Sequence, residues 1–224
     1  LKKLVGGIGY LMKKNKITHL QGFASFVDRS TVLITKHDGT TQTVTANNVI
    51  VATGSVPTKL PIPGLDAADI WHANHEASKR VVDGTIAEGA IWSSNEAVTA
   101  KHVPERLVVI GGGVIGVEFA YTYAGLGSKV TVLEFLPRVI ANMDADLGTE
   151  LAKILKKQGV ELKTEVKVTG VTDNADGGKT VAFEGKDGAV GSVEADVVLV
   201  ATGRTPFTEG LNLDGVGITL GSEK

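Results

Sequence analysis

VIGGGVIGVE, at residues 109–118, sets three glycines in a row and follows them with a fourth glycine and a glutamate. Gly111, Gly113 and Gly116 fill the pattern Gly-x-Gly-x-x-Gly, which opens many nucleotide-binding helices. Alone the pattern is weak, because the same glycines could form a tight corner between a strand and a helix with no ligand at all. The flanking residues have to separate these two interpretations.

The sequence on either side favours a turn that binds phosphate. RLVVIG at 106–111 is a continuous apolar run of the buried parallel-strand type, and the helical pattern after the glycines ends near Gly127. Gly111 would permit the sharp turn, Gly113 would let the backbone approach a pyrophosphate, and Gly116 would let helix and strand pack closely. The first-turn N–H groups and the helix dipole would then face two phosphates.

A carboxylate ends the next predicted strand, KVTVLE at 129–134, and lies 18 residues after Gly116. Glu134 can accept hydrogen bonds from the hydroxyl groups of an adenosine ribose, and its charge would repel a 2′-phosphate. We therefore predict NAD(H) binding in preference to NADP(H). Glu118 has two interpretations that the sequence leaves open. It is either an exposed residue near a helix N-terminus or a side chain directed along the cofactor cleft toward the nicotinamide.

Strands and helices alternate through the second half of the chain, which predicts βαβ units on a parallel sheet. The first half begins with an amphipathic helix that ends near Asn15, followed by an antiparallel meander with a hairpin signal in HDGT at 37–40. The fold class is therefore α/β: a doubly wound, parallel-sheet NAD-binding domain with a β meander, plus the incomplete C-terminal part of a second domain of the same type. The other predicted elements are a helix at 144–159 and strands at 22–27, 31–35, 41–45, 49–53, 160–164, 167–174, 179–185, 189–195 and 196–203.

The chain contains an internal repeat. Residues 46–57 read ANNVIVATGSVP and residues 195–206 read ADVVLVATGRTP, with seven of twelve positions identical. Buried strands before glycine turns can look alike by chance, but each copy also follows a predicted β meander and ends in the same proline. We interpret the copies as matching strands of two homologous dinucleotide-binding domains. Only the second copy has a glycine-rich turn upstream, so we expect the turn of the first domain to lie before residue 1.

Composition and charge exclude several classes of protein. The chain has 224 residues and a formal net charge of -2, so nothing indicates a basic nucleic-acid surface or a polybasic membrane patch. The absence of cysteine removes disulfides, thiolate metal sites and thiol catalysis from this sequence. There is no apolar run of about 18 residues, the length of a transmembrane helix. The chain begins without methionine, and we expect it to be a piece of a longer protein.

Two features carry weaker signals. Residues 55–104 are polar and rich in turn residues, and we predict a linker there with one short helix near 73–81. In its HANHE segment, His72 and His75 have a spacing that could share a metal ion, but no further ligand cluster supports this and we predict no metal site. Arg204 could either meet a phosphate or cap the end of a strand.

These motifs together resemble a known family. RLVVIGGGVIGVE, KVTVLEFLPRV, ILKKQGV, KVTGV and VVLVATGRTPFTEGL occur in the order and spacing of the dihydrolipoamide dehydrogenases, which are FAD-dependent, NAD-linked disulfide oxidoreductases with two dinucleotide-binding domains. The earlier stretches KKNKI, GFASF and NNVIVATGS are similar to the later part of that family's FAD domain. The resemblance covers most of the chain and implies FAD and NAD as cofactors.

The resemblance also implies roles for individual residues. Glu134 would contact the adenosine ribose, Val168 the adenine end and Gly203 the nicotinamide half of NAD. Glu118 would lie near the nicotinamide, where the family pairs it with a lysine on the flavin side. The remaining residues implied along NAD are Gly111, Gly112, Gly113, Val114, Ile115 and Gly116, and those implied along FAD are Ala24, Thr53, Gly54 and Ser55.

Parts of the family pattern are missing from this sequence. The family's FAD fingerprint and redox cysteine pair would precede residue 1, and its second FAD contact and its dimerisation domain, with the catalytic His and Glu, would follow Lys224. We therefore expect an internal fragment without a catalytic residue of its own. The expected division is a partial FAD-binding domain at 1–64, a linker with an insertion at 65–103, an NAD-binding domain at 104–206 and a return to the FAD domain at 207–224.

The implied function is that of the NAD(H)-binding part of a dihydrolipoyl dehydrogenase, which oxidises protein-bound dihydrolipoamide through a disulfide and FAD with hydride transfer to NAD+. Implied partners of the full-length parent are the lipoyl-bearing acyltransferase of 2-oxo acid dehydrogenase complexes and a second copy of itself, with no nucleic acid or membrane. The implied location is the cytoplasm, or the mitochondrial matrix in a eukaryote. Two alternatives stay open: another disulfide reductase of the same superfamily, and a non-catalytic dinucleotide-binding module.

Overall fold

The computed structural model describes residues 2–65 and 91–221. The short helix predicted near 73–81 and the histidine pair His72 and His75 lie outside the described residues. Within the described part of the chain, no group of three or more His, Asp or Glu side chains is placed to hold a metal ion. None of the described helices is long and apolar enough to cross a membrane.

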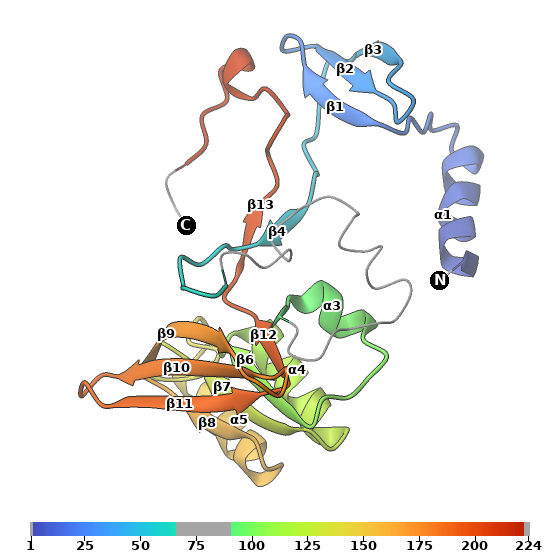
Figure 1. The fold of residues 1–224 in the computed structure, drawn as a ribbon. Coiled ribbons are helices and arrows are strands. Elements are labelled where there is room, and N and C mark those ends of the chain that lie inside the picture. The colour runs from blue at the N-terminus through green and yellow to red at the C-terminus, as the bar shows by residue number, and fades with distance from the viewer. Residues whose placement is uncertain (1, 66–90, 222–224) are drawn as a thin grey trace. The chain divides into compact units, whose positions relative to one another are not determined.

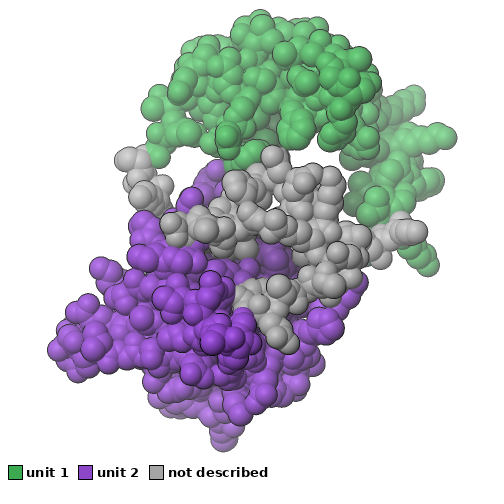
Figure 2. Space-filling model, viewed as in Figure 1, with its two compact units in different colours: residues 1–54, 207–224 green, residues 55–206 purple. Residues whose placement is uncertain are grey.

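The chain forms two compact units, which Figure 2 colours separately. The larger unit consists of residues 55–206 and contains the glycine-rich stretch. The smaller unit consists of residues 1–54 and 207–224, so the chain leaves it once and returns to it once. Each unit has a hydrophobic core of its own.

A five-stranded parallel sheet forms the centre of the larger unit (Figure 1). Its strands are β5 Ile91–Trp92, β6 Arg106–Ile110, β7 Lys129–Leu133, β8 Glu161–Lys163 and β12 Val197–Val200. They lie in the order β5-β12-β6-β7-β8, and every neighbouring pair is parallel. The apolar runs of β6, β7 and β12 are buried along nearly their whole length, as expected for a parallel sheet covered on both faces.

Different layers cover the two faces of this sheet. Successive side chains of a strand point to opposite faces, so Leu107 and Val109 pack among the helices while Val108 and Ile110 pack against an antiparallel meander. The helices are α3 Ser94–Thr99, α4 Val114–Gly125 and α5 Ala145–Lys157, and the meander strands are β9 Val166–Asp173, β10 Lys179–Gly185 and β11 Val190–Ala195. The predicted α/β class, with its parallel sheet and meander, is confirmed.

Local signals explain where the helices begin and end. Ser93 and Glu96 form a capping box at the start of α3, where the backbone N–H of Ser93 donates to the Glu96 carboxylate at 2.8 Å. Gly127, just after α4, has φ +103, which confirms the predicted stop. Tyr123 of α4 donates from its hydroxyl to the carbonyl of Ala97 at 2.8 Å, and burial raises the pKa of this phenol. α3 and β5 both lie within the stretch that the sequence suggests is a linker.

Residues 49–53, in the first copy of the internal repeat, form no strand, which corrects the prediction of a buried strand there. Ile50 is 90% exposed, whereas the equivalent residues of β12 in the second copy are buried between β5 and β6. No other strand of the described residues pairs with 49–53, so its backbone groups have no ladder to join. The ends of the two copies, β4 Ser55–Pro57 and β13 Arg204–Pro206, do pair with each other as an antiparallel ribbon.

The smaller unit contains one helix, an antiparallel meander and a returning C-terminal segment. Its elements are α1 Lys2–Lys14, β1 Phe23–Phe26, β2 Thr31–Thr35, β3 Thr41–Thr45 and a 3₁₀ turn at Asp214–Val216. The predicted Asp-Gly hairpin is confirmed, because Gly39 between β2 and β3 has φ +82. The returning segment packs on the meander: Phe26 donates its N–H to the carbonyl of Leu211 at 2.9 Å, and both side chains are buried.

Two amphipathic helices leave apolar residues uncovered. Leu4 of α1 is 73% exposed, although α1 matches the predicted helix closely. On α5 the predicted apolar face is only partly buried, because Leu155 is inaccessible while Leu147 is 55% exposed. Helical periodicity therefore identifies these helices correctly but does not show which part of each apolar face another element covers.

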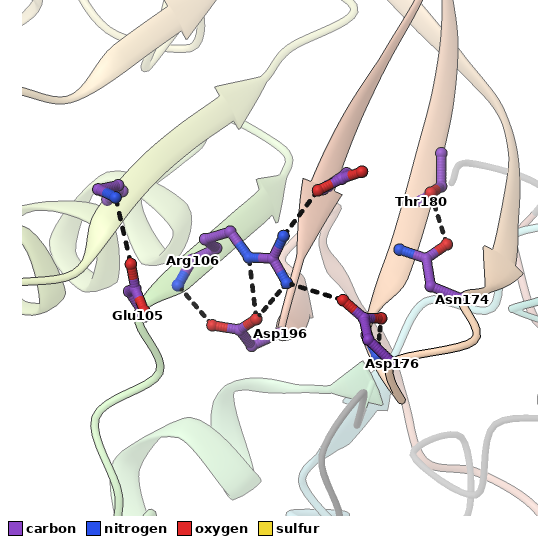
Figure 3. Close-up of polar contacts among 9 residues, drawn as sticks. Glu105, Arg106, Asn174, Asp176, Thr180 and Asp196 are labelled. Carbon is purple, nitrogen blue, oxygen red and sulfur yellow. Dashed lines mark hydrogen bonds and ion pairs between the residues drawn. The ribbon is translucent and has the colours of Figure 1, made fainter.

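Arg106 joins the amino-terminal end of the parallel sheet to the meander (Figure 3). Its guanidinium donates to Asp196 from Nε at 2.9 Å and from Nη2 at 2.7 Å, and its backbone N–H donates to the same carboxylate at 2.8 Å. Glu194 and Asp176 complete the cluster at 2.7 Å and 3.6 Å. Burial alone would raise the pKa of Asp196, but the hydrogen bonds and charge of Arg106 outweigh it and hold this pKa below its ordinary value of 3.8.

We expect Arg106→Met to lower the free energy of unfolding by about 1–3 kcal/mol at neutral pH, because Asp196 loses its charged donor. This loss of unfolding free energy should shrink as the pH falls below 3.8. Because the pKa of Asp196 is lowered in the folded chain, its ion pair with Arg106 stabilises the fold above pH 3.8, and the stabilisation is lost as Asp196 is protonated. Urea unfolding followed by circular dichroism at about pH 7 and about pH 3 measures both effects.

The matched control is Lys129→Met, which breaks the exposed Lys129–Glu105 pair at 3.2 Å and should cost less than about 1 kcal/mol. Equal losses for the two variants, or an Arg106→Met loss that stays constant at low pH, would contradict this account of the cluster.

Candidate functional site

A cavity of about 1010 Å³ lies at the carboxyl ends of the parallel strands in the larger unit. Ligands of open α/β sheets bind outside these strand ends, so the cavity lies where the fold type predicts a ligand. Its wall contains much of the stretch that the sequence singles out, together with the ends of β7 and β12. The lining residues are 60–63, 110–111, 113–115, 133–136, 142, 166–169 and 201–203.

Two glycines allow the turn and helix to pack closely beside the cavity. Gly111 has φ +107, donates its N–H to the carbonyl of Leu133 at 2.9 Å, and would place a Cβ 2.5 Å from the carbonyl oxygen of Ala201. A Cβ on Gly116 would lie 2.0 Å from the carbonyl oxygen of Gly111. Neither backbone oxygen can move aside easily, so both positions require glycine for packing.

Gly113 differs, because no atom lies within 4 Å of the place where its Cβ would be. It is the N-cap of α4 and offers no side-chain cap. The first N–H groups of a helix have no partner within the helix, and here they begin at the cavity wall, where Val114 and Ile115 also lie. Open space in front of unpaired donors and a helix dipole is the arrangement that holds a phosphate.

Glu134 holds the glycine turn from the end of β7. Its side chain is only 9% exposed, one carboxylate oxygen accepts the N–H of Gly112, and the other accepts the N–H of Leu136 at 2.7 Å. The carbonyl of Gly112 in turn accepts the N–H of Ile140 at 2.8 Å. The sequence predicts Glu134 as a ribose ligand, but its position gives no sign of this second contact with the turn.

The structure gathers seven of the implied NAD residues in the cavity wall and places the others elsewhere. Gly112 and Gly116 are buried and Glu118 is exposed, and all three lie outside the lining. The seven are Gly111, Gly113, Val114, Ile115, Glu134, Val168 and Gly203.

The residues implied along FAD are divided between the two units. In the smaller unit Ala24 is an exposed residue of β1, the hydroxyl of Thr53 donates to the carbonyl of Phe207 at 2.5 Å, and the carbonyl of Gly54 accepts the N–H of Phe207 at 2.9 Å. In the larger unit Ser55 begins β4. No single unit therefore brings these four residues together.

Arg204 forms contacts within the larger unit. Its guanidinium donates to the hydroxyl of Ser55 at 2.8 Å, to the carbonyl of Ser55 at 2.6 Å and to the hydroxyl of Ser94 at 3.3 Å. Of the two interpretations that the sequence leaves open, these bonds favour a structural role at the start of β13.

Several lining residues were missed by the sequence analysis. The segment 60–63 falls in the turn-rich linker predicted at 55–104, yet the carbonyl of Pro63 accepts the N–H of Val171 at 2.9 Å and so bonds the segment to β9. Lys167 and Asn142 also line the cavity. The apolar spacing in LPIPGL could have suggested a packed segment, and Leu65 is fully buried in the structure. Nothing in the sequence marks Asn142 as a lining residue.

Comparison with known proteins agrees with this architecture. The sequence pattern of the family described as pyridine nucleotide-disulphide oxidoreductase matches residues 1–224. The chain belongs to this family. Its relatives include a dihydrolipoamide dehydrogenase of Chaetomium thermophilum, 41% identical over 97% of this chain and 39% of the relative, and a mitochondrial dihydrolipoyl dehydrogenase of Bos taurus, 40% identical over 98% and 40%.

A solved structure of this disulphide oxidoreductase type shares the fold. The HOCl-induced flavoprotein disulfide reductase RclA from Escherichia coli, in a Cu(II) complex, superposes with a TM-score of 0.71 and 26% sequence identity, over 91% of this chain and 40% of that chain. The chain therefore spans about two fifths of the length of the relatives that it matches.

Gly116 and Gly113 should respond very differently to the same substitution. We expect Gly116→Ala to lower the free energy of unfolding by about 3 kcal/mol or more, because the new Cβ meets backbone at 2.0 Å. Gly113→Ala should change the free energy of unfolding by less than about 1 kcal/mol, since φ -69 suits alanine and the space is open, while alanine is a poorer N-cap residue than glycine. Urea unfolding of both variants is the measurement, and a large loss for Gly113→Ala would show that its surroundings are filled.

Proposed function

We propose that residues 55–206 bind NAD(H) in the cavity at the carboxyl ends of the parallel strands. The observation that carries this proposal is the open space at Gly113, which lies before the N-terminus of α4 in the same cavity wall as Glu134. A pyrophosphate needs close backbone approach and unpaired N–H donors, and a ribose needs a carboxylate at the end of the second strand. The cavity supplies both.

Each part of the dinucleotide has a proposed neighbour. The N–H groups of the first turn of α4 would hold the pyrophosphate, and Glu134 would accept hydrogen bonds from the adenosine ribose. Both oxygens of Glu134 already accept backbone N–H groups, but a carboxylate has about four acceptor positions and can accept further bonds. Val168 would lie at the adenine end and Gly203 near the nicotinamide half.

We further propose that the chain is the NAD(H)-binding part of a dihydrolipoyl dehydrogenase. Relatives that are 40–41% identical carry that name. The cofactors of such an enzyme, FAD and NAD, carry the redox chemistry. Ala24, Thr53, Gly54 and Ser55 would lie along FAD, and Glu118 would lie near the nicotinamide. The residues of this chain would bind and orient the nucleotide rather than react with it.

The partners proposed for the full-length parent are a lipoyl-bearing acyltransferase and a second copy of itself. The proposed domain division is the expected one, with the NAD-binding domain at 104–206, and residues 60–63 add to the wall of its cavity. For a eukaryotic source the proposed location is the mitochondrial matrix, and the name of the Bos taurus relative describes that protein as mitochondrial. Another disulfide reductase is the second candidate, and the likeness to RclA supports it.

Titration with NADH tests the binding site. We expect Gly113→Ala to weaken NADH binding by about 10-fold or more, because a methyl group would occupy the space of the pyrophosphate. Gly9→Ala is the matched control, since a Cβ there also meets nothing within 4 Å and Gly9 lies on α1 in the other unit. Isothermal titration calorimetry with NADH compares the wild type, Gly113→Ala and Gly9→Ala. Equal NADH affinities for all three would overturn the assignment of the cavity as the NAD(H) site.

Activity of the chain by itself tests the proposed relation to the parent enzyme. We expect no dihydrolipoamide-dependent reduction of NAD+, because the sequence contains no cysteine to exchange electrons with a dithiol. The absorbance of NADH is the readout. Sustained turnover would show that the chain contains a complete catalytic apparatus and would contradict the proposal.

A further inference from the structure

Lys167 lies in the cavity wall beside the end of β7, where the adenosine ribose is proposed to bind. The start of β9 is hydrogen-bonded to that strand end: Val166 donates its N–H to the carbonyl of Glu134 at 3.0 Å, and Glu165 donates its N–H to the carbonyl of Leu136 at 3.1 Å. Lys167 is the next residue of β9, is exposed and lines the same cavity as Glu134.

The ammonium group of Lys167 has no ion-pair partner among the described residues. Glu184 stands directly opposite it on β10 in the antiparallel register, yet the two side chains form no ion pair. Other lysines of this region are paired, as Lys163 is with Glu161 at 2.6 Å. Lys167 is therefore an exposed lysine of the cavity wall that pairs with no carboxylate of the described residues.

The negative charge of Glu134, at the same end of the cavity, is less available to a ligand than the ammonium group of Lys167. Glu134 is 9% exposed, and both of its oxygens accept backbone N–H groups. A 2′-phosphate on the ribose would therefore meet one engaged carboxylate, which repels it, and one free ammonium group, which attracts it. Discrimination between NADH and NADPH then depends on the balance of two residues rather than on Glu134 alone.

We propose that Lys167 is a specificity-determining residue that supports binding of a 2′-phosphate and so limits the preference for NAD(H) which Glu134 imposes. The proposal rests on the proposed NAD(H) site. It assigns to the wild-type chain a weak but measurable affinity for NADPH, and it assigns that affinity to one lysine on β9.

The test compares NADH and NADPH binding to the wild type, Lys167→Met, Glu134→Gln and the double variant. Methionine keeps the length of the side chain and removes its charge. We expect Lys167→Met to weaken NADPH binding by about 5-fold or more while NADH binding changes by less than about 2-fold. Glu134→Gln should strengthen NADPH binding relative to NADH, and the double variant should lose most of that gain. The effect of Lys167→Met should shrink at high salt, because the lysine is exposed.

The control is Lys156→Met, which removes an exposed lysine of α5 that does not line the cavity and should leave the NADH-to-NADPH ratio unchanged. NADPH is measured by displacement of bound NADH, and thermal unfolding shows that each variant is folded. If Glu134→Gln does not fold, Lys167→Met against the wild type decides the question.

The possible failures are distinct. A wild-type chain that binds neither nucleotide overturns the proposed NAD(H) site itself. A chain that binds NADH, but from which NADPH never displaces it, or whose NADH-to-NADPH ratio is the same with Lys167 and with Met, overturns only the role of Lys167.

Discussion

The geometry of the site depends on the backbone of Gly112, which is hydrogen-bonded through both its N–H and its carbonyl. Glu134 accepts its N–H and Ile140 donates to its carbonyl. A side chain could not fit there easily, because a Cβ would lie 3.0 Å from Val139 and 3.1 Å from Glu134. Ile140 has φ +43, a strained conformation for a β-branched residue, and its bond to Gly112 is one interaction that offsets this strain. The same carboxylate thus holds the glycine turn and faces the proposed ribose position.

The charged cluster that stabilises the fold and the candidate binding site lie at opposite ends of the parallel strands. β6 begins at Arg106, whose ion pairs with the meander lie at the amino-terminal end of the sheet. It ends at Ile110, just before Gly111, where the chain turns toward α4 at the cavity wall. Because the buried length of β6 lies between the charged cluster and the glycine turn, substitutions in the cluster should affect unfolding without changing the turn.

The sequence predicts the parallel-sheet part of the fold well because its signals are local. The apolar run of β6, the glycines after it and the stop at Gly127 each act over a few residues. The prediction of a strand at 49–53 is wrong for a non-local reason. The same kind of apolar run forms β12 in the second copy, where β5 and β6 flank it. Residues 49–53 form no strand, because no strand of the described residues lies beside them. Lys167 was missed for a related reason, since only the bonds between β9 and the end of β7 bring it to the cavity.

The internal repeat has a structural consequence that neither copy shows alone. The final three residues of both copies, β4 and β13, pair antiparallel, so that Pro206 stands opposite Ser55 and Arg204 stands opposite Pro57. Each strand of this ribbon is three residues long and ends in a proline, so the two prolines lie at opposite ends of it. Proline cannot donate a hydrogen bond to a ladder. Arg204 compensates by donating to the hydroxyl and carbonyl of Ser55. Side-chain bonds thus strengthen a ribbon whose backbone pairing is limited, at the two points where the chain passes between its units.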